Sequence, residues 1–71
     1  MPAFKPKEVV SILQKLGFIR KRQTGSHLIM YSAKTGITIP IPMHTKDLGK
    51  GLLKSVIKNA ESSEEEFLKL K

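Results

Sequence analysis

Two histidines are the side chains in this chain of 71 residues that are best suited to chemistry. His27 follows Gly25-Ser26, which has the form of a two-residue hairpin turn with glycine at the position that needs a positive φ. We therefore expect His27 to begin a strand, where regular backbone would hold it in place. Imidazole changes charge near neutral pH and can act as a general acid or base. A histidine at a strand end can equally be an ordinary polar residue.

His44 follows the third expected strand and lies close in sequence to Asp47. It is either a second acid–base or phosphate-contacting group or a polar cap beside that carboxylate. Two histidines without an acidic cluster make a poor metal site, because a catalytic zinc usually takes three protein ligands. Ser26 cannot be a nucleophile activated by His27, because neighbouring strand residues point to opposite faces. No Gly-rich phosphate loop is present, so we expect acid–base catalysis without a metal or cofactor.

The chain carries 13 Lys and Arg against 6 Asp and Glu, a formal net charge of +7. Residues 1–60 hold 11 basic and 2 acidic side chains, whereas residues 61–71 hold 2 basic and 4 acidic ones. A basic body attracts phosphate backbones or an acidic protein partner, unless its charge serves only solubility. RNA is the polymer that suits a histidine, which can deprotonate the 2′-hydroxyl for attack on the adjacent phosphate.

The apolar spacing predicts the order α-β-β-β-α with a short extra helix. The expected helices cover 6–16 and 50–60, and the expected strands cover 18–24, 27–32 and 37–41. Asp47 is the expected cap of the second main helix, and Ser63 that of the final one. Pro40 and Pro42 cannot donate to a ladder, so the third strand is an edge or ends early. The economical assembly is one α+β domain over 1–71, with a three-stranded antiparallel sheet covered on one face by the helices.

Several cations are expected to follow the polymer. Alternation in the first strand sends Arg20 and Arg22 to one face and Lys21 to the other. Lys50 begins a series of lysines that recur every four residues along the second main helix, and Lys46 lies just ahead of it. An ordinary solvated helix face normally mixes both signs of charge. The residues expected to contact RNA or a protein partner are Lys21, Arg22, Lys46, Lys50 and Lys54.

Composition also limits the compartment and the kind of substrate. The chain has no cysteine, which excludes disulfides and thiolate metal sites and favours an intracellular compartment. No segment approaches the roughly 20 apolar residues of a membrane span. So short a chain does not enclose a deep pocket, and a polymer lying across the surface fits it better than a small metabolite. We expect a cytoplasmic protein that does not bind membranes.

A longer ordered set of residues carries a family resemblance. It comprises Gly17-Phe18, basic residues, Gly25-Ser26-His27, Ile41-Pro42-Met43-His44, and the run from Leu48 to Lys58. This set resembles the HicA-type mRNA interferase toxins of HicA–HicB toxin–antitoxin pairs, over nearly the whole chain. The resemblance implies a fold similar to double-stranded RNA-binding domains, cleavage of mRNA and neutralisation by a HicB-type antitoxin. It also implies that His27 is the catalytic histidine, while His44 matches a second recurrent histidine of the family.

Two other functions remain open from the sequence. A binding module of this fold would hold double-stranded RNA by its shape and do no chemistry. His27 is the residue that discriminates, because a pure binder needs cations where this chain has an imidazole. A degenerate toxin that now only binds its HicB-type partner is the other alternative.

Overall fold

The computed structural model describes residues 2–71 and has the expected order of elements. Its helices are α1 (Pro6–Lys15), α2 (Lys50–Asn59) and α3 (Glu64–Leu70), and its strands are β1 (Ile19–Thr24), β2 (His27–Tyr31) and β3 (Thr38–Pro42). Each element lies within about one residue of the bounds that the apolar spacing predicts, which confirms the α+β reading. No helix in this part of the chain is both long enough and apolar enough to cross a membrane.

The three strands form one sheet in the order β1-β2-β3, and both pairings are antiparallel. β3 is therefore an edge strand. This confirms the first of the two possibilities that Pro40 and Pro42 leave open, because proline has no N–H to donate to a ladder. Leu28 and Met30 of β2 are buried, as are their partners Ile41 and Ile39 on β3. These four side chains form the sheet half of the core.

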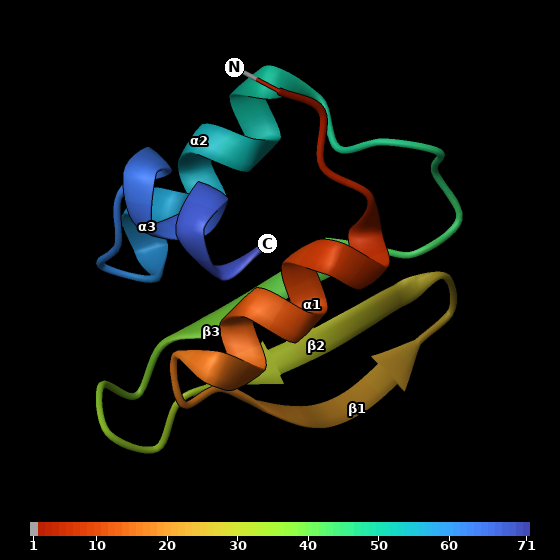
Figure 1. Cartoon of the computed structure of the whole chain (residues 1–71). Helices are drawn as coiled ribbons and strands as arrows, with labels where there is room; N and C mark the ends of the chain where they lie inside the picture. Colours follow the sequence, from red (N-terminus) through yellow and green to blue (C-terminus); the bar gives the residue numbers. More distant parts are fainter. Residues whose placement is uncertain (1) are drawn as a thin grey trace.

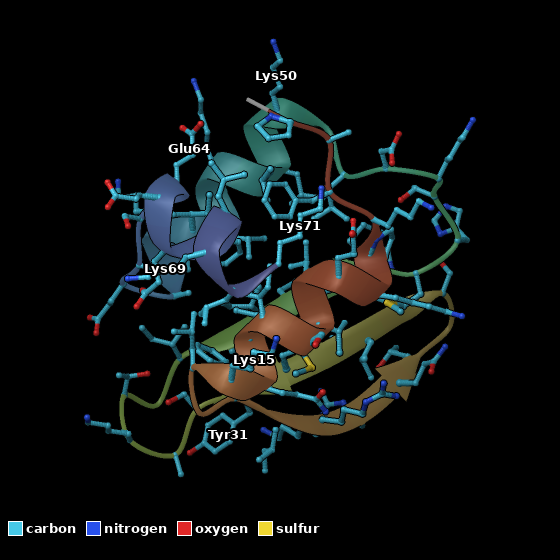
Figure 2. All side chains as sticks on the ribbon, in the orientation of Figure 1. Lys15, Tyr31, Lys50, Glu64, Lys69 and Lys71 are labelled. Carbon is cyan, nitrogen blue, oxygen red and sulfur yellow. The ribbon has the colours of Figure 1, made fainter. Side chains whose placement is uncertain are left out.

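All three helices lie on one side of the sheet (Figure 1), as predicted. α1 crosses the sheet and buries an apolar stripe that includes Ile12 and Leu13. α2 and α3 continue the same core above it, through Leu53 and Phe67. The opposite face of the sheet is uncovered, and Tyr31 projects from it in Figure 2.

The pairing of β1 with β2 contains a bulge, because the register shifts between Arg20 and Arg22. Arg20 lies opposite Met30, whereas Arg22 lies opposite Ile29. Met30 and Ile29 are consecutive residues of β2 and therefore point to opposite faces of the sheet. Each arginine shares the face of the residue it pairs with, so Arg20 and Arg22 also point to opposite faces. The expectation that they share a face was wrong, because the extra residue of a bulge breaks the alternation.

The helix starts differ from the expectations in one case and agree in another. α2 begins after Gly49, whose backbone is extended and which supplies no side-chain cap. Asp47 is exposed and lies outside the helix, so its expected role as a cap was wrong. Ser63 does cap α3, because its hydroxyl accepts a hydrogen bond from the backbone N–H of Glu66 at 3.1 Å. The Glu66 carboxylate accepts a hydrogen bond from the Ser62 hydroxyl.

Candidate active site

The hairpin between β1 and β2 places His27 at the first position of β2. Gly25 has a φ of 59°, whereas Ser26 does not have a positive φ, a combination typical of a type II′ turn. Thr24 pairs with His27, which closes the two-residue loop. The His27 side chain is exposed, so a polymer can reach it from solvent.

A backbone hydrogen bond brings the second histidine to the first. The N–H of Met43 donates to the carbonyl of Ser26 at 2.7 Å, so the residue that follows each end of this bond is a histidine. The ring centroids of His27 and His44 lie 6.5 Å apart, with 62° between the ring planes. The structure therefore brings together two imidazoles that are distant in the sequence.

Both rings are open to a ligand. His27 and His44 are exposed, and within residues 2–71 neither ring forms a hydrogen bond. At this centroid separation the ring nitrogens are too far apart to bond each other directly. A phosphate group with acceptor oxygens on both sides could accept hydrogen bonds from both rings.

Two of the expected cations lie beside the histidines. Arg22 pairs with Ile29 two positions along the ladder from the Thr24–His27 pair, so it shares the face of His27. Two strand residues span about 7 Å, which keeps the guanidinium within reach of a phosphate at that ring. Lys46 follows His44 by two residues and is exposed.

The other three expected cations lie elsewhere. The Lys21 ammonium is 5.0 Å from the centroid of the Tyr31 ring, at the end of β2 remote from His27. Lys50 projects from the top of the molecule in Figure 2. Lys54 lies one helical turn further along α2 and is exposed. An RNA chain would have to run over the uncovered sheet face or over α2 to reach these lysines.

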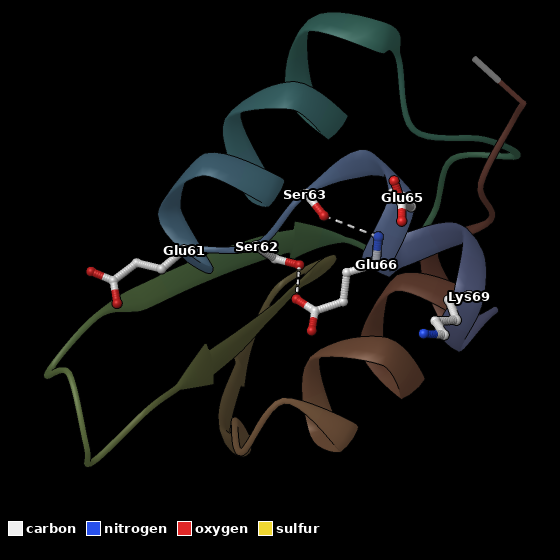
Figure 3. A pocket seen from close by; sticks show the side chains of 6 residues that line it. All are labelled: Glu61, Ser62, Ser63, Glu65, Glu66 and Lys69. Carbon is white, nitrogen blue, oxygen red and sulfur yellow. Dashed lines mark hydrogen bonds between the residues drawn. The ribbon is translucent and has the colours of Figure 1, made fainter.

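An acidic cleft occupies the turn between α2 and α3 (Figure 3), and its volume is about 400 Å³. It is lined by Glu61, Ser62, Ser63, Glu65, Glu66 and Lys69. The serine hydroxyls bond within the cap of α3, and the carboxylates would repel a phosphate. This turn and the β1–β2 hairpin lie at opposite sides of Figure 1, so the acidic cleft is not part of the histidine site.

A second cleft, of about 410 Å³, lies beside His44, between the start of α1 and the segment 43–46. It is lined by Lys5, Pro6, Lys7, Glu8, Met43, Thr45 and Lys46. Of these residues, only Lys46 is among the contacts predicted from the sequence, because the two walls are far apart in the chain. Within residues 2–71, no three His, Asp or Glu side chains come together as metal ligands would.

The family comparison covers the elements that carry this site. A family model described as "HicA toxin of bacterial toxin-antitoxin" matches residues 6–61, from the first residue of α1 to just past the end of α2. The match includes both histidines and the Gly25-Ser26 turn that precedes His27. A comparison with curated proteins found no match. From the family match, this chain belongs to the HicA family, the toxins of bacterial toxin–antitoxin systems.

Proposed function

We propose that this toxin is a metal-independent endoribonuclease that cleaves mRNA, with His27 and His44 as its acid–base pair. The observation that supports this proposal is the approach of the two exposed rings, at 6.5 Å between centroids. RNA carries its own nucleophile, the 2′-hydroxyl, so the protein needs only to move protons and stabilise charge. The exposed position of both rings suits a polymer that lies across the surface.

The reaction follows from these two groups. One histidine removes the proton of the 2′-hydroxyl, and the resulting oxygen forms a bond to the adjacent phosphorus. The bond from phosphorus to the 5′-oxygen breaks, and the other histidine gives its proton to that oxygen. The products are a 2′,3′-cyclic phosphate and a 5′-hydroxyl. Arg22 and Lys46 stabilise the charge that develops on the phosphate.

The test compares the full-length protein with two variants on RNA in excess chelator. His27→Ala should lower the cleavage rate by roughly 10²–10⁴-fold, the usual contribution of a general acid or base. Gln14→Ala, at an exposed residue of α1 whose side chain forms no hydrogen bond within residues 2–71, is the control and should cleave as wild type does. Cleavage by His27→Ala at the wild-type rate would contradict the role of His27. Cleavage by wild type only after metal is added would contradict the metal-independent mechanism.

The antitoxin partner that the family implies is, in this proposal, a HicB-type protein. An antitoxin that covers the exposed histidines would block access of RNA, and an acidic surface would complement the basic body of the toxin. Growth arrest on expression, relieved by the product of the neighbouring reading frame, is the expected result. A purified complex in which the toxin still cleaves RNA at the free rate would contradict this form of inhibition.

A non-catalytic module for double-stranded RNA is the second candidate. The lysines of α2 favour it, because Lys50, Lys54 and Lys58 are exposed and recur every four residues along this helix. Under this alternative, RNA is bound with a steep salt dependence and is recovered intact. The same assay therefore separates the two functions.

A further inference from the structure

We propose that the cleft between the start of α1 and the segment 43–46 is a nucleotide subsite, which holds the nucleotide next to the scissile phosphate of an RNA substrate. The inference rests on the proposed ribonuclease function. The cleft has a volume of about 410 Å³, within the range of small-ligand sites. Of the two clefts described above, it is the one that adjoins the loop carrying His44.

The position of the cleft follows from the chain around His44. Met43 and Thr45, the two neighbours of His44 in sequence, both line it. Neighbouring Cα atoms are about 3.8 Å apart, so the wall of the cleft begins within one residue of the candidate catalytic ring. A strand of RNA with its phosphate between the histidines would therefore carry the next nucleotide to this cleft.

Two backbone hydrogen bonds hold the walls in place. The N–H of Leu48 donates to the carbonyl of Phe4 at 2.9 Å, which ties the end of the loop to the segment before α1. The N–H of Met43 donates to the carbonyl of Ser26, which ties the start of the same loop to the hairpin of His27. These bonds fix both ends of the loop that forms one wall of the cleft, and the second bond joins this loop to the residue before His27.

The charges of the cleft suit a phosphate group. Lys5, Lys7 and Lys46 are exposed around it, and Glu8 is its one acidic residue. The Glu8 carboxylate is already engaged, because one oxygen accepts the backbone N–H of Lys5 at 2.8 Å and the other lies 3.9 Å from the Lys71 ammonium. The three lysine ammonium groups are left to attract an anion.

The remaining lining residues suit the base or sugar. Pro6 and Met43 offer an apolar surface. Thr45 contributes a hydroxyl whose oxygen is buried and, within residues 2–71, is the one buried side-chain oxygen or nitrogen without a hydrogen-bond partner. A buried polar group is normally paired. Rotation of this side chain toward the cleft would give its hydroxyl a partner on a bound nucleotide.

The direct test locates a bound nucleotide on the full-length protein by nuclear magnetic resonance. The probe is a trinucleotide of 2′-O-methyl RNA, which binds but lacks the attacking hydroxyl. We expect the amide signals of Lys7, Thr45 and Lys46 to shift together with that of His27. Shifts at His27 and the sheet face without shifts in the cleft would overturn the inference, as would a trinucleotide that moves no amide at all.

Two substitutions test the same site by affinity. Thr45→Val removes the hydroxyl and keeps the shape, and Lys7→Gln removes one charge. Each should weaken binding of the trinucleotide by roughly 2- to 10-fold, the size of one hydrogen bond or charge contact. Lys7→Gln should also reduce the dependence of log affinity on log salt by about one unit. Lys34→Gln, an exposed lysine in the turn before β3, is the matched control and should change neither quantity.

Stability and cleavage measurements distinguish a nucleotide subsite from a protein contact. Thr45→Val removes an unpaired buried hydroxyl, so it should unfold at an equal or higher urea concentration than wild type while binding RNA more weakly.

Loss of antitoxin binding by Thr45→Val and Lys7→Gln, with RNA binding unchanged, would overturn the inference in favour of a protein contact. Wild-type protein that shows the cleft shifts but cleaves no RNA would support the subsite and contradict the ribonuclease proposal. Cleavage with unmoved cleft signals would do the reverse.

Discussion

The two histidine rings are positioned by backbone contacts. Catalytic histidines are often oriented by a carboxylate that accepts from the second ring nitrogen. Within residues 2–71, no such acceptor bonds His27 or His44, and Asp47 is exposed without a bond to either ring. The hairpin pairing and the hydrogen bond from Met43 to Ser26 set where the rings stand. In the proposed mechanism, contacts with the RNA substrate would complete the orientation of the two rings.

The roles of the two histidines can be separated by the pH dependence of cleavage. With one histidine acting as base and the other as acid, kcat/KM of wild type should form a bell against pH, because one ring must be neutral and the other protonated. His44→Ala should lower kcat/KM and should also remove its decline on one side of the pH optimum. Asp47→Asn, which changes a neighbouring carboxylate that bonds neither ring, is the control and should keep both limbs. A complete bell in His44→Ala would remove His44 from the acid–base pair.

Gly25 can be compared with Gly51 by the same substitution. A Cβ added at either position meets no atom within 4 Å, but Gly25 has a φ of 59° while Gly51 lies inside α2. Gly25→Ala should lower the free energy of unfolding by about 1–2 kcal/mol, the cost of left-handed backbone, and should slow cleavage by displacing His27. Gly51→Ala should raise the free energy of unfolding by about 1 kcal/mol through helix propensity. Urea unfolding measures both, and a change of the same sign in the two variants would contradict the argument.

Among the elements, α2 begins in a way that costs it stability. Its first turn contains no acidic residue, its N-cap Gly49 supplies no side chain, and Lys50 places a positive charge at the positive end of the helix dipole. A helix selected for stability alone would carry the opposite charge there. A start of α2 that faces a phosphate backbone or an acidic partner would account for this arrangement.

Reversing the charge at each end of α2 tests whether its start is such a contact. Lys50→Glu should raise the free energy of unfolding by about 0.3–1 kcal/mol, because a negative charge is favourable at the helix start. Lys58→Glu makes the same change of net charge in the last turn and should lower the free energy of unfolding by a similar amount. Both are read from urea midpoints at low salt. If the start of α2 contacts RNA, Lys50→Glu should also weaken RNA binding although the protein is more stable.

At the scale of the whole molecule, α3 closes the core from the far end of the chain. Phe67 is fully buried and its ring centroid lies 6.2 Å from that of Phe4, so the first and last segments meet. The Lys15 ammonium donates to the carbonyl of Leu70 at 2.9 Å, and the Lys71 ammonium donates to that of Ala3 at 3.0 Å. α3 is therefore an integral part of the domain, although the family match ends at residue 61.

The contribution of α3 can be measured with two neighbouring residues. Phe67→Ala should cost about 3–5 kcal/mol in the free energy of unfolding, a large share of the roughly 5–15 kcal/mol of a typical domain. Leu68→Ala, whose side chain is 41% exposed, should change it by less than about 1 kcal/mol. Chemical denaturation gives both values. Equal effects would show that α3 does not pack as the structure has it.

Charge is also distributed over the whole molecule. The β1–β2 hairpin that leads into His27 lies at one side, and the α2–α3 turn that holds the acidic cleft lies at the other side. Such a separation orients an approaching polyanion before contact and raises its rate of association at low salt. In the proposed ribonuclease, the acidic cleft would therefore help to direct RNA toward the histidines.

The sequence by itself determined the elements and the local site. Apolar spacing predicted the helices and strands, because burying one face of an element is a local requirement. Gly25-Ser26 predicted the hairpin that starts β2 at His27, because the turn type depends on backbone φ that glycine permits. Family resemblance came from the same linear order of residues.

Tertiary structure decided what depends on residues far apart in the chain. It set the distance between His27 and His44, which follows from the pairing of β2 with β3 and from the bond between Met43 and Ser26. It also formed the cleft beside His44, whose two walls come from opposite halves of the chain. The bulge between Arg20 and Arg22 could not be predicted from the sequence. The alternation of side chains within β1 does not show how β1 is aligned with β2. The proposed active site is thus specified by long-range strand pairing, which local patterns do not encode.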